Sequence, residues 1–138
     1  MRAHHIGIYV NNLGQSEKFY SLFGFNVEKR FTLDEEEISF LHSEDQIKIE
    51  LIQAKDITPV EGTIHLAWVV DNFEQSFKNL KAQGLQPTEG PIHLPNGWKT
   101  AFYHGPNNEV IEILGASVVL KNGRHVYFRK FRSKMIIS

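Results

Sequence analysis

The sequence predicts an α+β fold made of two βαβββ modules that follow one another along the chain. Two observations lead to this prediction: the chain repeats itself, and each copy runs through the same succession of strand-like and helix-like patterns. The length agrees, because 138 residues suit one ordinary domain and are too few for two large ones. We place module one at 1–53, a connector at 54–63 and module two at 64–114.

The repeat is visible in two aligned blocks. Residues 5–12 (HIGIYVNN) lie over residues 65–72 (HLAWVVDN), and residues 40–52 lie over residues 102–114 with two more residues of spacing. The slip falls between the blocks, where loops accept insertions at little cost. Chance similarity between amphipathic strands would not also align histidine, asparagine and glutamate, so we infer an internal duplication.

Each module is expected to begin with a strand and a helix. A short β-rich run is followed by an asparagine N-cap with glutamine three residues later, a variant of the capping box. Apolar residues at helical spacing follow, and a glycine ends the helix. The positions are strands at 4–10 and 64–70, N-caps at Asn12 and Asn72, and terminal glycines at Gly24 and Gly84.

Three more strands complete each module. Polar loops separate the last two strands, and Pro106-Asn107-Asn108 is a strong turn signal. The expected strands lie at 26–33, 37–42 and 46–53 in module one, and at 86–92, 98–104 and 109–114 in module two.

Strand alternation predicts where the repeated polar side chains lie. The strand face of Ile6 and Ile8 is apolar and should pack on the helix, so His5 on the other face should lie away from it. The same reasoning in the other strands puts His65, Glu50 and Glu112 on the face away from the helices. The pattern therefore predicts a metal site made from two histidines and two glutamates.

Physical chemistry favours a cation at such a site. A lone strand histidine or glutamate is more often an ordinary surface or core residue, but four of them recur here at equivalent places. Two carboxylates buried together repel each other and lose hydration, a cost that a divalent ion removes. Two imidazoles and two carboxylates suit Zn, Ni, Co, Mn or Fe(II).

Composition narrows the function classes. There is no cysteine, so disulfides, thiolate catalysis and cysteine-ligated metals are excluded, and a cytoplasmic location is expected. No apolar run reaches the roughly 20 residues of a membrane-spanning helix, and the N-terminal residues carry no signal-peptide pattern. The net charge of −1 argues against nucleic-acid binding.

The charge is divided unevenly along the chain. Residues 1–114 hold 9 Lys and Arg against 16 Asp and Glu, whereas residues 115–138 hold six basic residues and no acidic one. This basic C-terminal extension is expected to form a β-hairpin around Asn122-Gly123. We rank three roles for it: an arm that binds a second copy in a homodimer, an anion-binding strip, and a solvated extension.

Several motifs resemble the vicinal oxygen chelate (glyoxalase/bleomycin resistance/dioxygenase) superfamily. The resemblance rests on residues 5–13, Phe23-Gly24-Phe25, residues 65–71 and residues 105–112, and spans residues 4–114. It implies mixed sheets that curl to form a metal-binding cleft, with the helices on the outer faces. The metal ligands implied are His5, Glu50, His65 and Glu112, the residues that the repeat also selects.

The ligand set most resembles that of a glyoxalase I-like lyase or isomerase. That resemblance implies a metal that stabilises an enediolate after a carboxylate takes a proton from a small thiol-adduct substrate. Glu112 would be the leading base and Glu50 its counterpart across the pseudo-twofold. Tyr9 stands where bacterial glyoxalase I enzymes carry arginine, so the thiol stays open.

Other functions compete with this one. Methylmalonyl-CoA epimerase performs a similar proton abstraction, but usually has glutamine at the position of Glu50. Fosfomycin-modifying relatives use three protein ligands and need a cationic pocket, for which only Lys99 and the distant basic tail are candidates. A dioxygenase-like enzyme and a non-catalytic protein that binds a small ligand are the remaining alternatives.

Four aromatic residues are candidates for a substrate pocket, and two ways of pairing the modules are compatible with the sequence. Aromatic strand residues are usually core residues, yet four of them lie close to the expected ligands. The two modules can pair within one chain or swap between two chains, and we expect a homodimer with a small-molecule substrate. The pocket candidates are Tyr9, Trp98, Phe102 and Tyr103.

Overall fold

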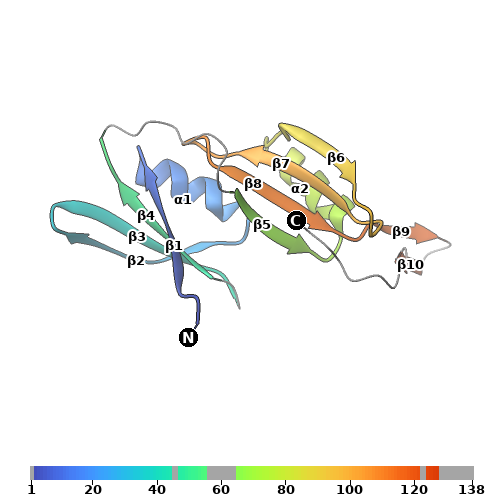
Figure 1. Cartoon of the computed structure of the whole chain (residues 1–138), viewed down its shortest axis with the longest axis horizontal. Coiled ribbons are helices and arrows are strands. Elements are labelled where there is room, and N and C mark those ends of the chain that lie inside the picture. Colours follow the sequence, from blue (N-terminus) through green and yellow to red (C-terminus); the bar gives the residue numbers. More distant parts are fainter. Residues whose placement is uncertain (1, 45–46, 56–64, 122–123, 128–138) are drawn as a thin grey trace. The chain divides into compact units, whose positions relative to one another are not determined.

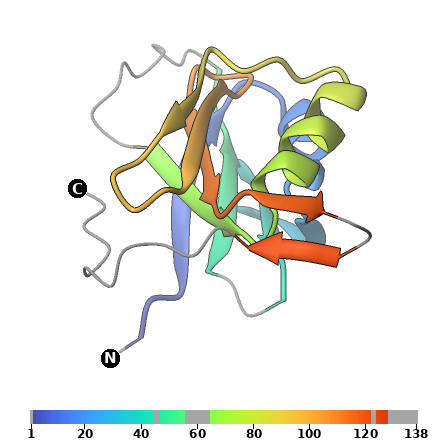
Figure 2. The same ribbon diagram turned by 90° about the vertical axis from the view of Figure 1, so that its right-hand side faces the viewer.

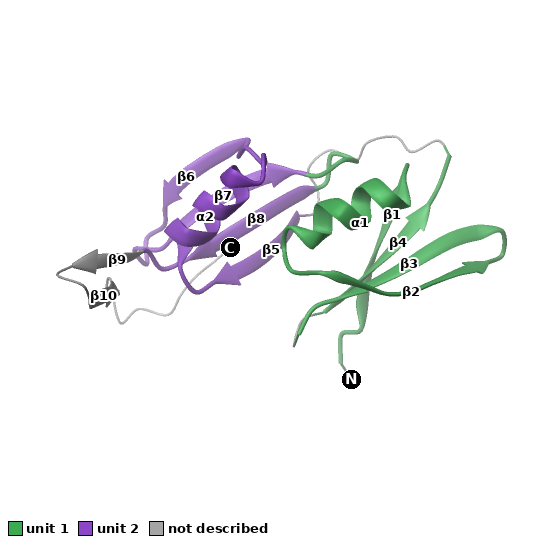
Figure 3. Ribbon diagram, turned by 180° about the vertical axis from the view of Figure 1, so that it is seen from behind, with its two compact units in different colours: residues 1–61, 105–109 green, residues 62–104, 110–138 purple. Residues whose placement is uncertain are grey.

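The computed structural model describes residues 2–44, 47–55, 65–121 and 124–127, and it confirms the predicted α+β class (Figure 1). The chain divides into two compact units, coloured separately in Figure 3. Unit 1 comprises residues 1–61 and 105–109, and unit 2 comprises residues 62–104 and 110–138. Most of the predicted connector at 54–63 lies outside the described residues.

Unit 1 is a four-stranded mixed sheet with one helix against it. The sheet order is β1-β4-β3-β2, with β1 and β4 parallel and the other neighbours antiparallel. Helix α1 contacts β2, β3 and β4. The elements are β1 (His5–Val10), α1 (Leu13–Ser21), β2 (Asn26–Leu33), β3 (Glu36–His42) and β4 (Lys48–Gln53).

Unit 2 repeats this arrangement with the equivalent elements. Its order is β5-β8-β7-β6, again with a parallel first pair and antiparallel neighbours, and α2 contacts β7 and β8. Both sheets are curled and open rather than closed. The elements are β5 (His65–Val70), α2 (Phe73–Ala82), β6 (Glu89–His93), β7 (Lys99–His104) and β8 (Val110–Gly115).

The predicted N-caps of both helices are confirmed, and Gly84 directly follows the C-cap of α2, whereas α1 ends at Ser21 with its C-cap at Leu22, two residues before Gly24. Asn12 Oδ1 accepts a hydrogen bond from the backbone N–H of Gln15 at 2.9 Å, and the side chain of Asn72 caps α2 in the same way. Gly24 and Gly84 both have a φ of +88°, the left-handed conformation that glycine adopts without strain after a helix. Each helix is therefore set by its own local sequence.

The two faces of each sheet differ as the alternation predicts. In β1 the side chains of Ile6, Ile8 and Val10 are more buried than those of His5 and Tyr9. The helix-covered side holds the core of each unit, and this leaves the other face for polar side chains. The core residues include Tyr20, Phe25, Leu41, Ile49 and Leu51 in unit 1, and Phe73, Leu80, Tyr103, Ile111 and Ile113 in unit 2.

The loop between β7 and β8 is part of unit 1, although the sequence places it in module two. The Tyr20 hydroxyl donates a hydrogen bond to Glu109 Oε2 at 2.8 Å, and Asn107 Nδ2 donates one to Ser16 Oγ at 3.3 Å. Burial and the neighbouring Glu109 carboxylate raise the pKa of Tyr20 well above its usual range. The loop is thus held by hydrogen bonds that the repeat pattern does not predict.

Two further strands follow the second module. β9 (Val118–Lys121) pairs antiparallel with β10 (Arg124–Tyr127), as Figure 2 shows in orange-red. The predicted Asn122-Gly123 turn and residues 128–138 lie outside the described residues. Within the described part of the chain, neither helix has the length and apolar character needed to cross a membrane.

Candidate metal and catalytic site

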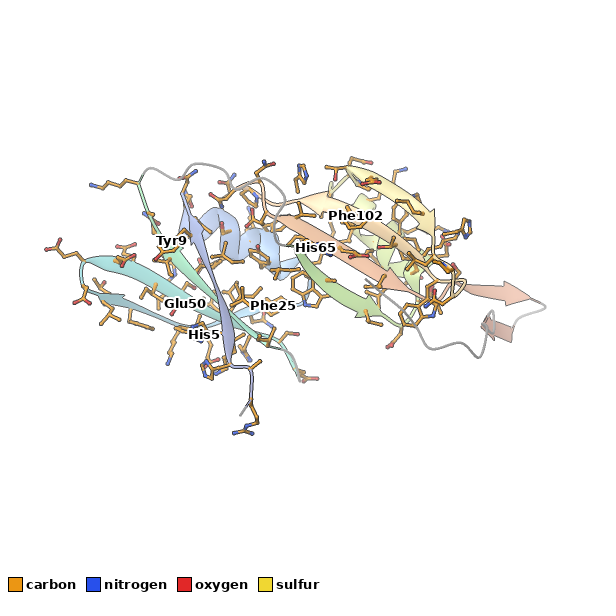
Figure 4. All side chains as sticks on the ribbon, in the orientation of Figure 1. His5, Tyr9, Phe25, Glu50, His65 and Phe102 are labelled. Carbon is orange, nitrogen blue, oxygen red and sulfur yellow. The ribbon has the colours of Figure 1, made fainter. Side chains whose placement is uncertain are left out.

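The first half of the candidate site lies on the uncovered face of the unit 1 sheet (Figure 4). His5 on β1 and Glu50 on β4 are brought together because Gly7, two residues after His5, is in register with Glu50. His5 Nε2 lies 3.9 Å from Glu50 Oε2, too far for a hydrogen bond but close enough for an ion pair. Gly7 leaves space beside the carboxylate, since a Cβ there would lie 3.5 Å from Glu50 Oε1.

The second half has the same construction in unit 2. Ala67 on β5 is in register with Glu112 on β8, and His65 is two residues before Ala67. His65 Nε2 lies 3.0 Å from Glu112 Oε1, which is hydrogen-bond distance. The repeated register therefore produces a repeated histidine–glutamate pair.

Beside each histidine–glutamate pair lies a phenylalanine from the third strand of the same unit. Phe40 on β3 is in register with Glu50, and its ring meets that of His5 edge-on at 5.2 Å between centroids. Phe102 on β7 is in register with Glu112, and its ring meets that of His65 edge-on at 6.0 Å. Each sheet thus carries the same histidine, glutamate and phenylalanine cluster.

The two glutamates differ in their surroundings. The side chain of Glu112 is 7% exposed and that of Glu50 is 20% exposed. The Thr100 hydroxyl donates a hydrogen bond to Glu112 Oε2, with 2.5 Å between Oγ1 and Oε2. The equivalent of Thr100 in unit 1 is Ile38, which has no hydroxyl to give. Sequence reasoning missed this difference, because the aligned blocks begin two residues later, at 40 and 102; extending the same 62-residue offset backwards pairs Ile38 with Thr100.

A second histidine touches the unit 1 pair. His4 precedes β1, and its Nδ1 lies 2.8 Å from Nδ1 of His5. One of these two nitrogens must donate and the other accept. Because Nδ1 of His5 is engaged in this way, Nε2 is the ring nitrogen of His5 that lies toward Glu50.

The pocket candidates fall in different environments. Tyr9 is 56% exposed on the same face as His5, and Phe102 is the half-buried neighbour of His65 described above. Trp98 is half-buried just before β7. Tyr103 is a correction to the prediction: it is fully buried, because it follows Phe102 and so lies on the face that α2 covers. It belongs to the core of unit 2 and not to a pocket beside Glu112.

Lys99 is not available as the cation of a substrate pocket. Lys99 Nζ lies 2.5 Å from Glu74 Oε1 on α2, and Ser117 Oγ donates to the same oxygen at 3.2 Å. The hydrogen bond from Lys99 holds the pKa of Glu74 below its ordinary value of 4.5. The interaction ties α2 to β7 and turns the ammonium group toward the helix.

Unit 1 ties its helix to its sheet in a similar way. Glu17 on α1 accepts hydrogen bonds from Arg30 on β2 and from Ser39 on β3, the latter at 2.7 Å. The hydrogen bond from Arg30 lowers the pKa of Glu17. Both carboxylates on the helices are therefore structural and lie away from the histidine–glutamate pairs.

The donors of the two pairs fit a divalent metal ion. Imidazole nitrogen and carboxylate oxygen are ligands for Zn, Ni, Co, Mn or Fe(II), and each pair already brings one of each within 4 Å. Each unit supplies two such side chains. Among the described residues, no three or more His, Asp or Glu side chains gather closely enough to hold an ion.

Comparison with known proteins identifies the family of this architecture. Residues 4–102 match the family model described as the Glyoxalase/Bleomycin resistance protein/Dioxygenase superfamily. The uncharacterised protein YwbC of Bacillus subtilis (strain 168) is 31% identical over 119 residues, which cover 80% of this chain and 94% of that protein.

Solved structures share the fold at lower identity. A glyoxalase family protein from Enterococcus faecalis superposes with a TM-score of 0.70 at 20% identity, covering 82% of this chain and 96% of that one. The trypanothione-dependent glyoxalase I of Leishmania major superposes with a TM-score of 0.70 at 22% identity, covering 83% of this chain and 86% of that one.

Proposed function

Because the chain belongs to the glyoxalase/bleomycin resistance protein/dioxygenase superfamily, we propose that it is a divalent-metal-dependent enzyme of the glyoxalase I type, a lyase or isomerase. The observation that carries the proposal is the duplicated cluster of histidine, glutamate and phenylalanine. Each cluster combines an imidazole with a carboxylate, and the two together supply four possible metal ligands. Two carboxylates and two imidazoles are the donor set that a metal-assisted proton transfer requires.

His5, Glu50, His65 and Glu112 would hold the ion, Zn, Ni, Co, Mn or Fe. When bound, the ion would polarise a substrate carbonyl and stabilise the negative charge that develops on its oxygen. Both histidines have Nε2 toward the carboxylate of their own pair, the arrangement expected of paired ligands. The Phe40 and Phe102 rings restrict the imidazoles to these orientations.

The proton transfer itself belongs to a carboxylate of the chain. We propose Glu112 as the base, with Glu50 as its counterpart. Glu112 would take the proton from the hydroxyl-bearing carbon next to the substrate carbonyl and deliver a proton to the former carbonyl carbon. The hydroxyl proton passes through solvent to the former carbonyl oxygen, so the substrate is isomerised without net gain or loss of protons. The proton on Glu112 can exchange with solvent between the two transfers, which introduces deuterium in deuterated water.

The proposed substrate is a small thiol adduct of a 2-oxoaldehyde such as methylglyoxal. The structural similarity to a trypanothione-dependent glyoxalase I supports a thiol adduct as the class to test first. We propose that Tyr9, which is exposed, contacts the apolar part of the substrate; a tyrosine there does not supply the positive charge that arginine would offer a substrate carboxylate. We also propose a homodimer in the cytoplasm, with the cysteine-free composition supporting that compartment.

Metal analysis tests the site first. The purified protein, dialysed and then titrated with Ni, Co, Zn or Mn, should bind one ion per set of the four proposed ligands. His5→Ala and Glu112→Gln should both weaken binding, while His104→Ala, an exposed histidine at the end of β7, should not. Absence of binding with all four ions would overturn the site.

A second assay tests the chemistry. The metal-loaded protein should exchange solvent deuterium into the hemithioacetal of methylglyoxal and glutathione, or into that of methylglyoxal and cysteine. Exchange into methylmalonyl-CoA alone would identify the epimerase-like alternative. A metal-loaded protein that exchanges deuterium into none of these would be a binding protein or an oxygenase, and the proposed isomerase would be wrong.

A further inference from the structure

The two halves of the site are not equivalent, and the difference lies in one hydroxyl group. Thr100 and Ile38 occupy equivalent places in the two modules, on β7 and on β3. Thr100 is 2% exposed, and its hydroxyl contacts a carboxylate that is itself 5% exposed as a whole residue. Ile38 leaves Glu50 without such a contact.

The hydroxyl of Thr100 has a choice of two acceptors. It lies 2.5 Å from Glu112 Oε2 and 3.1 Å from the backbone carbonyl oxygen of Ile113. The hydroxyl group has one hydrogen to donate, and it donates that hydrogen bond to the nearer oxygen, which belongs to a carboxylate. The bond to Glu112 is therefore the one that forms.

The consequence is that the two oxygens of Glu112 have separate roles. Oε2 is held by Thr100, whereas Oε1 lies toward His65 at 3.0 Å. A carboxylate held at one oxygen cannot rotate freely about its last bond, so its second oxygen keeps one direction. Among the residues that the structure describes, no hydroxyl holds Glu50 in this way, and its side chain is more exposed.

We propose that Thr100 is a positioning residue that fixes Glu112 and thereby makes Glu112, rather than Glu50, the carboxylate that transfers the proton. The part of this proposal that concerns proton transfer rests on the proposed function. In that step Glu112 Oε1 takes the proton from the hydroxyl-bearing substrate carbon and, after exchange with solvent, delivers a proton to the former carbonyl carbon. The substrate hydroxyl proton passes through solvent to the former carbonyl oxygen, and Thr100 keeps Oε2 engaged throughout. Thr100 contacts neither the substrate nor its reacting atoms in this account.

Three variants separate the hydroxyl from the bulk of the side chain. Thr100→Val removes the hydroxyl at nearly constant volume, and Thr100→Ser keeps it. Ile38→Val is the matched control at the equivalent place in unit 1. All three are conservative substitutions in strands, and their far-ultraviolet circular dichroism and unfolding midpoints establish first that each is folded.

The first measurement needs neither metal nor substrate. Protein made with glutamate labelled with ¹³C at the carboxyl carbon gives one resonance per glutamate, and Glu112→Gln identifies the resonance of Glu112. We expect Thr100→Val to shift or broaden this resonance, and Thr100→Ser and Ile38→Val to leave it close to that of the wild type. An unchanged Glu112 resonance in Thr100→Val would overturn the positioning role, whatever the enzyme's reaction.

The second measurement tests the catalytic consequence. In Co²⁺-loaded protein, Thr100→Val should lower the turnover number for deuterium exchange into the methylglyoxal–glutathione hemithioacetal by roughly 10–100-fold, the usual effect of removing such a supporting partner. KM should change less than the turnover number, and Thr100→Ser should restore the rate. Equal rates for Thr100→Val and the wild type would overturn the assignment of the base.

The two measurements also distinguish failure of this inference from failure of the proposed function. If the wild type exchanges no deuterium, the proposed function is wrong, and the carboxyl resonance still decides whether Thr100 fixes Glu112. If the wild type is active and Glu50→Gln lowers the exchange rate more than Glu112→Gln does, the division of roles between the two glutamates is reversed and the proposal is wrong.

Discussion

Lys99 Nζ lies 2.5 Å from Glu74 Oε1, and this contact holds α2 against β7. Both side chains are partly buried, with exposed fractions of 24% and 32%. Ser117 Oγ donates to the same carboxylate oxygen. The interaction is therefore part of the packing of unit 2 and makes stability depend on pH.

Replacing Glu74 tests this pH dependence. The pKa of Glu74 is lower in the folded protein than its ordinary value of 4.5, so the folded state binds the proton less readily. Its stabilising contribution is complete above that ordinary value and is lost as the pH falls through the folded pKa. Glu74→Gln should cost about 1 kcal/mol at pH 7, with a difference from the wild type that shrinks below a pH of about 4.5.

Urea unfolding at a series of pH values measures this difference. Glu89→Gln, which changes an exposed carboxylate on β6 of the same unit, is the matched control and should change little at any pH. A cost of Glu74→Gln that stays constant from neutral pH down to strongly acidic pH would contradict the assignment.

The fold could be predicted from the sequence to a large extent because its determinants are local. Asparagine caps, terminal glycines and alternating strands act within a few residues, and the duplication repeated each of them. The turn between β2 and β3 shows the limit of local reasoning. Asp34 and Glu35 both have positive φ there, at 49° and 66°, although neither is the glycine or asparagine that usually signals such a turn.

The candidate site could be predicted only in part. Alternation places His5 and Glu50 on one face, but the partner of a strand threonine depends on the register of the next strand, so the role of Thr100 was not predictable from periodicity. The pairing of Lys99 was not predictable for a related reason, because its helix partner Glu74 is 25 residues away in the chain. Tyr103 was misjudged although alternation with Phe102 already places it in the core.

Tyr20 and Glu109 provide a test of the long-range contact in unit 1. Tyr20→Phe removes the hydroxyl that donates to Glu109 Oε2 at 2.8 Å and should lower the free energy of unfolding by about 1–2 kcal/mol, because hydrogen bonds to charged groups are worth more than neutral ones. Tyr9→Phe, at an exposed tyrosine, is the control and should have almost no effect. Equal stability of Tyr20→Phe and Tyr9→Phe would show that the bond contributes nothing.

The N-cap of α2 gives a prediction about local stability. Asn72→Ala leaves the backbone N–H of Gln75 without its side-chain acceptor and should cost about 1 kcal/mol. Asn72→Asp keeps an acceptor oxygen and adds a negative charge at the positive end of the helix dipole, so it should match the wild type or exceed it. Thermal unfolding of the two variants side by side checks this, and an aspartate variant as unstable as the alanine variant would be the contradicting result.

Metal binding should also appear as stabilisation of the folded protein. An ion that binds the folded state alone adds about 2.7 kcal/mol at a free concentration 100 times its Kd, which raises Tm by several degrees. His65→Ala removes the imidazole that lies 3.0 Å from Glu112, so most of this gain should disappear. His104→Ala, which changes another exposed histidine of unit 2, should keep the full gain. The measurement is Tm by calorimetry with and without Ni²⁺ or Zn²⁺, followed by addition of EDTA. If Tm rises equally in the wild type and in His65→Ala, the ion binds elsewhere on the chain, because loss of one of four ligands would weaken binding at the proposed site and reduce the gain.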